Sequence, residues 1–261
     1  MKRSTKRKIR LGVLYAVLAA LVLGIVLSAN WADIKTSFLN TDTMKALWPD
    51  IVLEAAKNTV LYTVIAFAGG LSLALVLALM KMSTVTPYRW LAVGYIEFFR
   101  GLPALIVIIA FGLAVPLAFS YNFPFGFVGA GVAALIVVSA AYMAETLRAG
   151  IQAVPKGQVE AARSLGMSSG RTTVSIVLPQ AFRIEIPPLT NEIVLLIKDT
   201  ALLAAIGVAE GQRELTTYAR DMMNLHSDAT PLLMAAVFYL IITLPMTRLV
   251  AALERRQQRA R

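Results

Sequence analysis

A lysine and an aspartate stand side by side in a largely apolar part of the sequence, at Lys198 and Asp199. If their helix begins at Pro188, a rise of about 1.5 Å per residue places them roughly 15 Å into it. A Lys or Asp at the centre of a membrane costs about 3 kcal/mol, so both side chains are expected to face a protein interior or a water-filled path. Glu192 lies seven residues before Asp199 and shares its helix face.

This set of charges suits a zwitterionic solute. Asp199 or Glu192 would attract an ammonium group, and Lys198 a carboxylate. A structural network with neighbouring helices is an equally supported interpretation of the same residues. Glu145 is a further candidate for the path, although an ion pair with Arg148, three residues on, is the ordinary explanation for its position.

The sequence lacks the residues that thiol chemistry, metal binding, intramembrane hydrolysis or ATP binding would require. The chain has no Cys, and its single His226 has no second ligand nearby, so neither a thiol nucleophile nor a metal site is expected. It has no His-Glu-x-x-His or Gly-x-Ser-x-Gly signature, which argues against an intramembrane enzyme. It also has no Gly-Lys pair and hence no phosphate-binding loop, so the chain cannot hydrolyse ATP alone and no directly bound cofactor is expected.

The composition is that of a membrane protein. The 261 residues are 58% hydrophobic and 15% charged, with a mean hydropathy of +0.70, whereas soluble domains are about a quarter charged. The formal net charge of +10 does not indicate nucleic acid, because Lys and Arg lie between apolar runs instead of clustering with aromatic residues. Their positions follow the positive-inside rule and place both termini in the cytoplasm.

Continuous apolar runs, without period-two alternation, predict an all-α membrane protein of about six transmembrane helices. The predicted spans are 11–29, 51–80, 102–119, 127–144, 188–209 and 231–253. Within the second span, small residues recur every fourth position from Gly70, either for close helix packing or as lipid-facing filler. A cleaved signal peptide is the alternative to an uncleaved first helix.

These spans divide the chain into four parts. The predicted parts are a basic N-terminus with the first helix (1–29), an extracytoplasmic stretch (30–50), a five-helix core (51–253) with a cytoplasmic loop at about 146–187, and a basic cytoplasmic tail (254–261). The loop holds the most informative pattern. Glu160 heads a predicted short helix whose small residues Ala161 and Ala162 let another backbone approach, Gly166 permits the turn that ends it, and Pro179 starts the return to the membrane.

The spacing of Glu-Ala-Ala, the following Gly and Ile-x-Leu-Pro at 176–179 resembles the loop of permease subunits in bacterial ATP-binding-cassette (ABC) importers. Residues 58–60, 98–103, 144–158, 179–183 and 197–202 are similar to the polar amino acid branch of that family. Leu102 and Ala201 replace residues that are often Thr and Ser in that branch. The resemblance covers about 50–253 and implies a type I ABC importer permease fold with an extra N-terminal helix.

The resemblance also implies function and partners. The chain would be the permease subunit of an ATP-driven importer for polar amino acids in the bacterial inner membrane, with residues 160–166 coupling it to an ATP-binding subunit. That subunit would hold ATP and Mg²⁺. A second permease copy, identical or paralogous, and an external solute-binding protein would complete the assembly. The alternative is an ATP-independent secondary transporter or channel that uses the membrane charges, and it leaves the docking loop unexplained.

Overall fold

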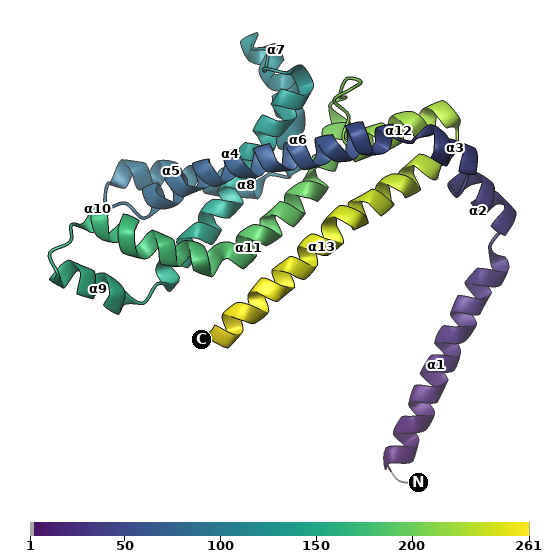
Figure 1. Cartoon of the computed structure of the whole chain (residues 1–261), viewed down its shortest axis with the longest axis horizontal. Helices are drawn as coiled ribbons and strands as arrows, with labels where there is room; N and C mark the ends of the chain where they lie inside the picture. The colour runs from purple at the N-terminus through teal and green to yellow at the C-terminus, as the bar shows by residue number, and fades with distance from the viewer. Residues whose placement is uncertain (1–2, 261) are drawn as a thin grey trace.

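The computed structural model describes residues 3–260, and side chains from 10 to 256 (Figure 1). The basic side chains expected at 2–8 and 259–261 therefore lie outside the described residues. Over the described range the chain is helical and has no strand, so the predicted all-α class is confirmed.

The helices follow one another with short connections. In chain order they are α1 (Arg3–Ser28), α2 (Trp31–Phe38), α3 (Thr41–Ala46), α4 (Lys57–Lys81), α5 (Thr86–Gly101), α6 (Ala104–Ile109), α7 (Val115–Phe119), α8 (Gly126–Ala153), α9 (Lys156–Ser164), α10 (Ser169–Thr172), α11 (Leu178–Asp199), α12 (Leu215–His226) and α13 (Thr230–Ala260). Wide π-helical turns precede α4, α7 and α11, and a 3₁₀ turn at Thr200–Ala205 follows α11. Figure 1 places α9 and α10 at one end of the bundle and α3 and α12 at the other.

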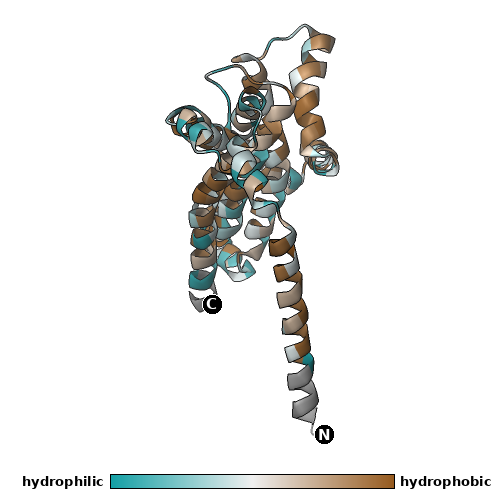
Figure 2. Ribbon diagram, turned by 90° about the vertical axis from the view of Figure 1, so that its right-hand side faces the viewer, coloured by the Kyte–Doolittle hydropathy of each residue, from teal (hydrophilic) through white to brown (hydrophobic). Residues whose placement is uncertain are grey.

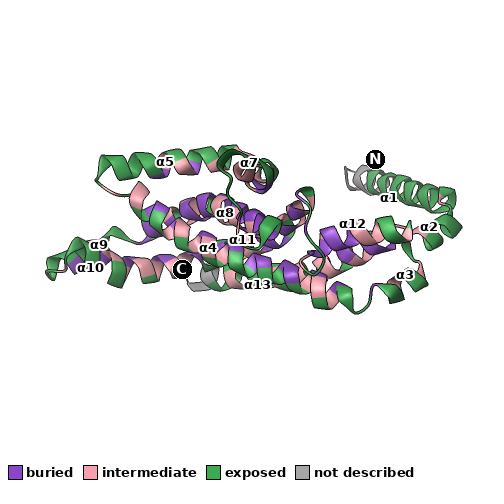
Figure 3. Ribbon diagram, turned by 90° about the horizontal axis from the view of Figure 1, so that it is seen from above, coloured by how far each residue is buried: buried purple, intermediate pink, exposed green. Residues whose placement is uncertain are grey.

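The centre of the fold is the packing of α4 against α8, the most buried helix (Figure 3). A side chain at Gly70 would place its Cβ 2.4 Å from the Ser139 hydroxyl oxygen, so a larger residue would require the Ser139 and Met143 side chains to move. Ala74 and Ala78 are fully buried on the same stripe. The small residues therefore serve close helix packing and are not lipid-facing filler.

Within the described residues, four helices are long and apolar enough to cross a membrane, namely 10–28, 51–81, 126–153 and 230–256. Helix α5 and the segment α6–α7 meet at residues 102–103 with a bend of 103°. If the two are counted together as one broken span, they form a fifth. By length and composition the described residues thus contain four or five candidate spans, compared with the predicted number of about six. Figure 2 shows how strongly apolar α1 and α13 are, and both lie mostly exposed, as expected of helices solvated by lipid.

The predicted start of the span 188–209 is wrong. Helix α11 begins ten residues earlier, where Pro179 occupies its first turn, and Pro187 and Pro188 lie inside it. Proline suits a first turn but does not always mark one, and a membrane-protein helix can continue through it. Helix α11 has 22 residues, but it contains too many charged residues to count among the helices that are apolar enough to cross a membrane. Lys198 and Asp199 lie at the end of this helix. Their expected depth near the membrane midplane was counted from Pro188 and is therefore no longer supported.

The predicted extracytoplasmic stretch folds into α2 and α3, which pack against the start of α13. The Thr43 hydroxyl donates to the Asp228 carboxylate at 2.6 Å, and the Asn40 backbone N–H donates to the Thr230 hydroxyl at 3.1 Å. These bonds attach the N-terminal segment to the rest of the bundle.

Candidate functional site

The first candidate site is the short helix α9, which follows Val154-Pro155 at the end of α8. It begins at Lys156, so Glu160 lies in its middle and does not head it as predicted. Glu160 and Ala161 are exposed, whereas Ala162 faces inward and is 6% exposed. The exposed face therefore offers a carboxylate beside a methyl group, which permits close approach by another backbone.

Gly166 ends α9, as predicted, with φ of +82°. Its N–H donates to the Arg163 carbonyl at 3.0 Å, and the Met167 N–H donates to the Ala162 carbonyl at 3.2 Å. This pair of bonds is the Schellman motif, which requires a left-handed residue and therefore favours glycine. Leu165, an apolar side chain that is 85% exposed at this turn, was not predicted. The sequence feature that could have predicted this exposed side chain is a large apolar residue directly before the glycine that ends the helix.

The second candidate site is a pocket of about 160 Å³ between α8 and α11. Glu192 and Asp199 both line it, so the predicted shared helix face of the two carboxylates is present. Ser139 and Tyr142 of α8 contribute hydroxyl groups, and the remaining lining is apolar. An ammonium or guanidinium group fits this chemistry, because two acidic acceptors in a confined space favour a cation.

Lys198 does not join the two carboxylates in this pocket. It is exposed on another face of α11, directly before the point where the helix gives way to a 3₁₀ turn. The Thr200 hydroxyl stabilises that transition by donating to the Ile197 carbonyl at 2.6 Å. The structure thus brings together two of the four path candidates and separates the third.

The fourth path candidate, Glu145, takes part in one ion pair within α8 and one between α8 and α4. The Arg148 guanidinium donates to its carboxylate at 2.9 and 3.1 Å, and Lys81 at the end of α4 pairs with the other carboxylate oxygen. Arg148 also donates to the Gln152 side chain at 2.7 Å. The expected ion pair with Arg148 is present, and the Lys81 partner, 64 residues away in sequence, was not predicted.

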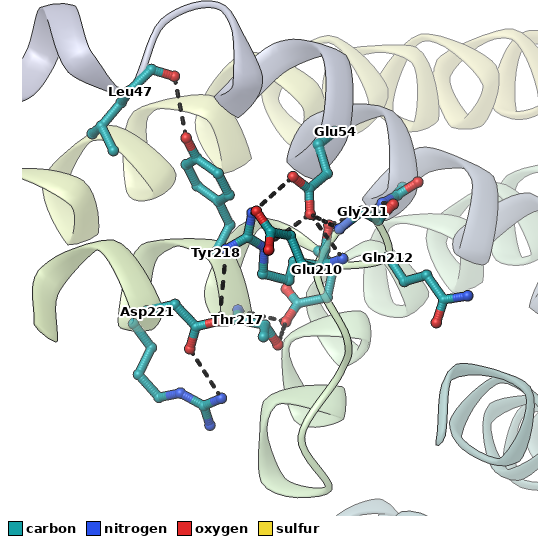
Figure 4. A network of polar contacts seen from close by, with 12 residues as sticks. Leu47, Glu54, Glu210, Gly211, Gln212, Thr217, Tyr218 and Asp221 are labelled. Atoms are coloured by element: carbon teal, nitrogen blue, oxygen red, sulfur yellow. Dashed lines mark hydrogen bonds and ion pairs between the residues drawn. The ribbon is translucent and has the colours of Figure 1, made fainter. Parts of the chain in front are cut away.

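A polar network at the opposite end of the bundle was missed entirely (Figure 4). Arg213 donates from Nε and Nη2 to the two carboxylate oxygens of Glu54, each at 2.9 Å. The Gly211 N–H donates to the same carboxylate at 2.9 Å. The Arg213 guanidinium also lies over the Tyr218 ring, 5.0 Å from its centre. Hydrogen bonding to Glu54 raises the pKa of Arg213, so the guanidinium stays charged.

Neighbouring side chains fix the backbone of the same loop. Asn58 donates to the carbonyls of Gly211 and Arg213, both at 3.1 Å, and the Tyr62 hydroxyl donates to the Gln212 carbonyl at 2.8 Å. The fully buried Glu214 caps α12 by accepting from backbone N–H groups, and its burial raises the pKa of its carboxyl group. Segment 211–214 is therefore held rigidly across the start of α4.

Metal binding finds no support in the described part of the chain, where no three His, Cys, Asp or Glu residues gather around a possible ion. What the fold does combine is a bundle of apolar spans, a pocket with two carboxylates and an exposed short helix at one end. These features are typical of a membrane transport protein.

Comparison with known proteins identifies the family. The model of the family described as binding-protein-dependent transport system inner membrane component matches residues 70–259, and the chain belongs to this family. The probable glutamine ABC transporter permease GlnM of Bacillus subtilis is 36% identical over 210 residues, which cover 80% of this chain and 94% of the relative. The L-cystine permease TcyB of the same organism is 35% identical, covering 93% and 96%.

Solved structures agree with this assignment. A crystal structure of an amino acid ABC transporter with histidines superposes with a TM-score of 0.72 at 35% identity, covering 82% of this chain and 97% of that one. The methionine ABC transporter MetNI shares the fold at 18% identity, with a TM-score of 0.56. The type I ABC importer permease fold is thereby confirmed, and the chain is a multi-pass inner-membrane permease of an ATP-driven importer.

Proposed function

We propose that this permease carries polar amino acids, and that the α8–α11 pocket receives the cationic group of the solute. The observation that carries the proposal is the convergence of Glu192 and Asp199 on one small pocket. The relatives support the solute class, since their names specify glutamine, arginine and cystine. The comparisons do not favour an ATP-independent transporter.

The partners proposed for this permease follow from its family and from the exposed helix α9. An ATP-binding subunit, which supplies ATP and Mg²⁺, docks on the exposed face of α9, and Glu160, Ala161 and Gly166 form the contact with the support of Ala162. A second permease copy, identical or paralogous, completes the solute path. An external solute-binding protein delivers the solute at the end of the bundle that carries α3 and α12, where the exposed Asp42 and Glu210 are available.

The orientation places α9 and both termini in the cytoplasm. The basic residues support it, because Lys156, Arg163 and Arg171 gather around α9 while Arg255 and Arg256 end the described side chains of α13. In this orientation Glu145 lies toward the inner end of α8, where its pair with Lys81 joins α4 to α8 and its pair with Arg148 lies within α8.

Replacing Lys198 with Met tests whether the solute carboxylate uses this ammonium group. Lys198 is exposed beside Asp199, so its loss should reduce uptake at least about tenfold, the value of one charge-assisted hydrogen bond of about 1.5 kcal/mol. Basal ATP hydrolysis and assembly should be unchanged, because Lys198 lies far along the chain from α9. Uptake of labelled amino acid into proteoliposomes measures the effect, and a variant with normal uptake would exclude the role.

Replacing Gly166 with Val tests the docking of α9. A β-branched residue forced to the left-handed φ of +82° costs about 1 to 2 kcal/mol, so recovery of the ATP-binding subunit with the tagged permease should fall about 5- to 30-fold. Open space surrounds the glycine, so a steric clash does not contribute.

The matched control is Gly166→Asn, because asparagine adopts the left-handed conformation at lower cost. Co-purification in mild detergent should rank the glycine chain first, Asn second and Val last. Equal recovery from all three chains would show that the turn after α9 does not determine docking.

A further inference from the structure

A larger cavity, of about 620 Å³, lies between α4 and α8 at the end of the bundle opposite α9. Leu61 and Ile65 from the first turns of α4 form one wall, and Ala133 and Ile136 of α8 form another. The aromatic segment 121–125 closes the third side. Its volume lies in the range of ligand-binding cavities, about 300–1,000 Å³.

The chemistry of this cavity excludes a polar amino acid. None of the described residues that line it is charged, whereas a buried ammonium or carboxylate needs an opposite charge. Of its polar side chains, Asn58 and Tyr62 are already engaged, since they donate to the backbone of 211–213, and Tyr121 and Gln212 add only uncharged groups. The remaining wall is aliphatic and aromatic. An apolar occupant is therefore favoured, in contrast to the pocket that contains Glu192 and Asp199.

The surroundings of the cavity indicate where such an occupant comes from. Helices α4 and α8 both belong to membrane spans, and Leu61 and Ile65 remain 45% and 44% exposed on the outward side of α4. At the rim, Phe125 is 81% exposed and Tyr121 is 50% exposed. Exposed aromatic residues at the end of a span are typical of the boundary between lipid and water. The cavity is thus continuous with the lipid-facing surface.

We propose that this cavity binds one acyl chain of a membrane phospholipid, whose headgroup lies at the aromatic rim. The rim is held in place without the lipid. A Cβ at Gly129 would lie 1.7 Å from the Pro124 carbonyl oxygen, so the segment packs directly on the first turn of α8. The Phe123 ring stacks on Phe111 with 5.8 Å between centres. A preformed cavity reduces the ordering cost of binding.

The bound chain would also touch the wall that supports the Arg213 network. Tyr62 lines the cavity and donates to the Gln212 carbonyl, and Gln212 lines the cavity too. An acyl chain in this position therefore stabilises segment 211–214 from the membrane side. The inference rests on the membrane fold and is independent of which solute the permease carries.

Native mass spectrometry of the full permease assembly, titrated with dioleoyl phosphatidylglycerol, tests the proposal. One lipid per permease chain should bind at least tenfold more tightly than the rest. Ala133→Phe, which fills the cavity, should weaken that lipid at least tenfold. The matched control Ala236→Phe, on the exposed face of α13, should keep it. Equal lipid binding by all three assemblies would overturn the proposal.

A second measurement does not depend on the folding of Ala133→Phe. In this experiment Trp31, Trp48 and Trp90 are replaced by Phe, and Phe125→Trp supplies a fluorescent reporter at the rim of the cavity. The fluorescence of this tryptophan is measured in vesicles that contain increasing fractions of phosphatidylglycerol with brominated acyl chains, which quench it. Quenching should saturate at a low brominated fraction. Quenching that only follows the bulk fraction, or that is reversed by excess polar amino acid, would contradict an acyl-chain site.

Discussion

Replacing Glu192 with Gln and Asp199 with Asn in the same chain is expected to reduce amino acid uptake about 100-fold or more. Both carboxylates line one pocket of about 160 Å³, so a bound ammonium group would contact both. A hydrogen bond to a charged group contributes about 1.5–3 kcal/mol, or about 10- to 100-fold in affinity. Initial uptake rates in proteoliposomes measure the loss, and each single variant should show part of it.

The matched control is Glu97→Gln, which removes a carboxylate from the exposed face of α5. It should leave uptake unchanged, and all variants should retain the ATP-binding subunit because none touches α9. If the double variant transports normally while remaining assembled, the two carboxylates belong to a structural network between helices, which is the alternative interpretation of their position.

The second large effect is on stability. Arg213→Ala should destabilise the permease by about 3 kcal/mol, because it leaves the Glu54 carboxylate, whose side chain is only 16% exposed, without its charged partner. The unfolding temperature should fall by about 6–12 °C for a chain of this size. The loop 211–214 should also loosen, since the Gly211 and Arg213 N–H groups donate to the same carboxylate.

Glu210→Gln provides the control for this prediction. The Glu210 side chain is 90% exposed and its carboxylate lies 3.9 Å from Arg213, so its removal should change stability by less than about 0.5 kcal/mol. Thermal unfolding in detergent, followed by loss of the monodisperse species, compares the three chains. Equal unfolding temperatures would mean that water already screens the Glu54–Arg213 pair.

Local signals in the sequence predicted much of this fold. Long apolar runs located the starts of the spans at Ile51 and Gly126 to within one residue, because a membrane span requires continuous apolar residues. The second of these spans continues to Ala153, beyond its predicted end at 144. Gly166 predicted the end of α9, because glycine adopts the left-handed conformation of this turn without steric cost. Pro179, which was expected to start the return to the membrane, lies in the first turn of α11.

The remaining features depend on contacts between distant segments. The Glu54–Arg213 and Lys81–Glu145 pairs join residues 159 and 64 positions apart, and no local pattern specifies such partners. The start of α11 was misplaced because Pro188 gives the same sequence signal inside a helix as at its first turn. That error also affected the depth assigned to Lys198 and Asp199, since it was counted from Pro188.

Uptake into proteoliposomes with ATP supplied on one side tests the central claim most directly. The purified assembly, its solute-binding protein and a mixture of labelled glutamine, arginine and cystine are used, with ATP either enclosed or added outside. Accumulation should require ATP on the side that carries α9 and should persist when a protonophore removes the proton gradient. Uptake that needs no ATP and stops with the protonophore would contradict an ATP-driven permease and indicate a secondary transporter.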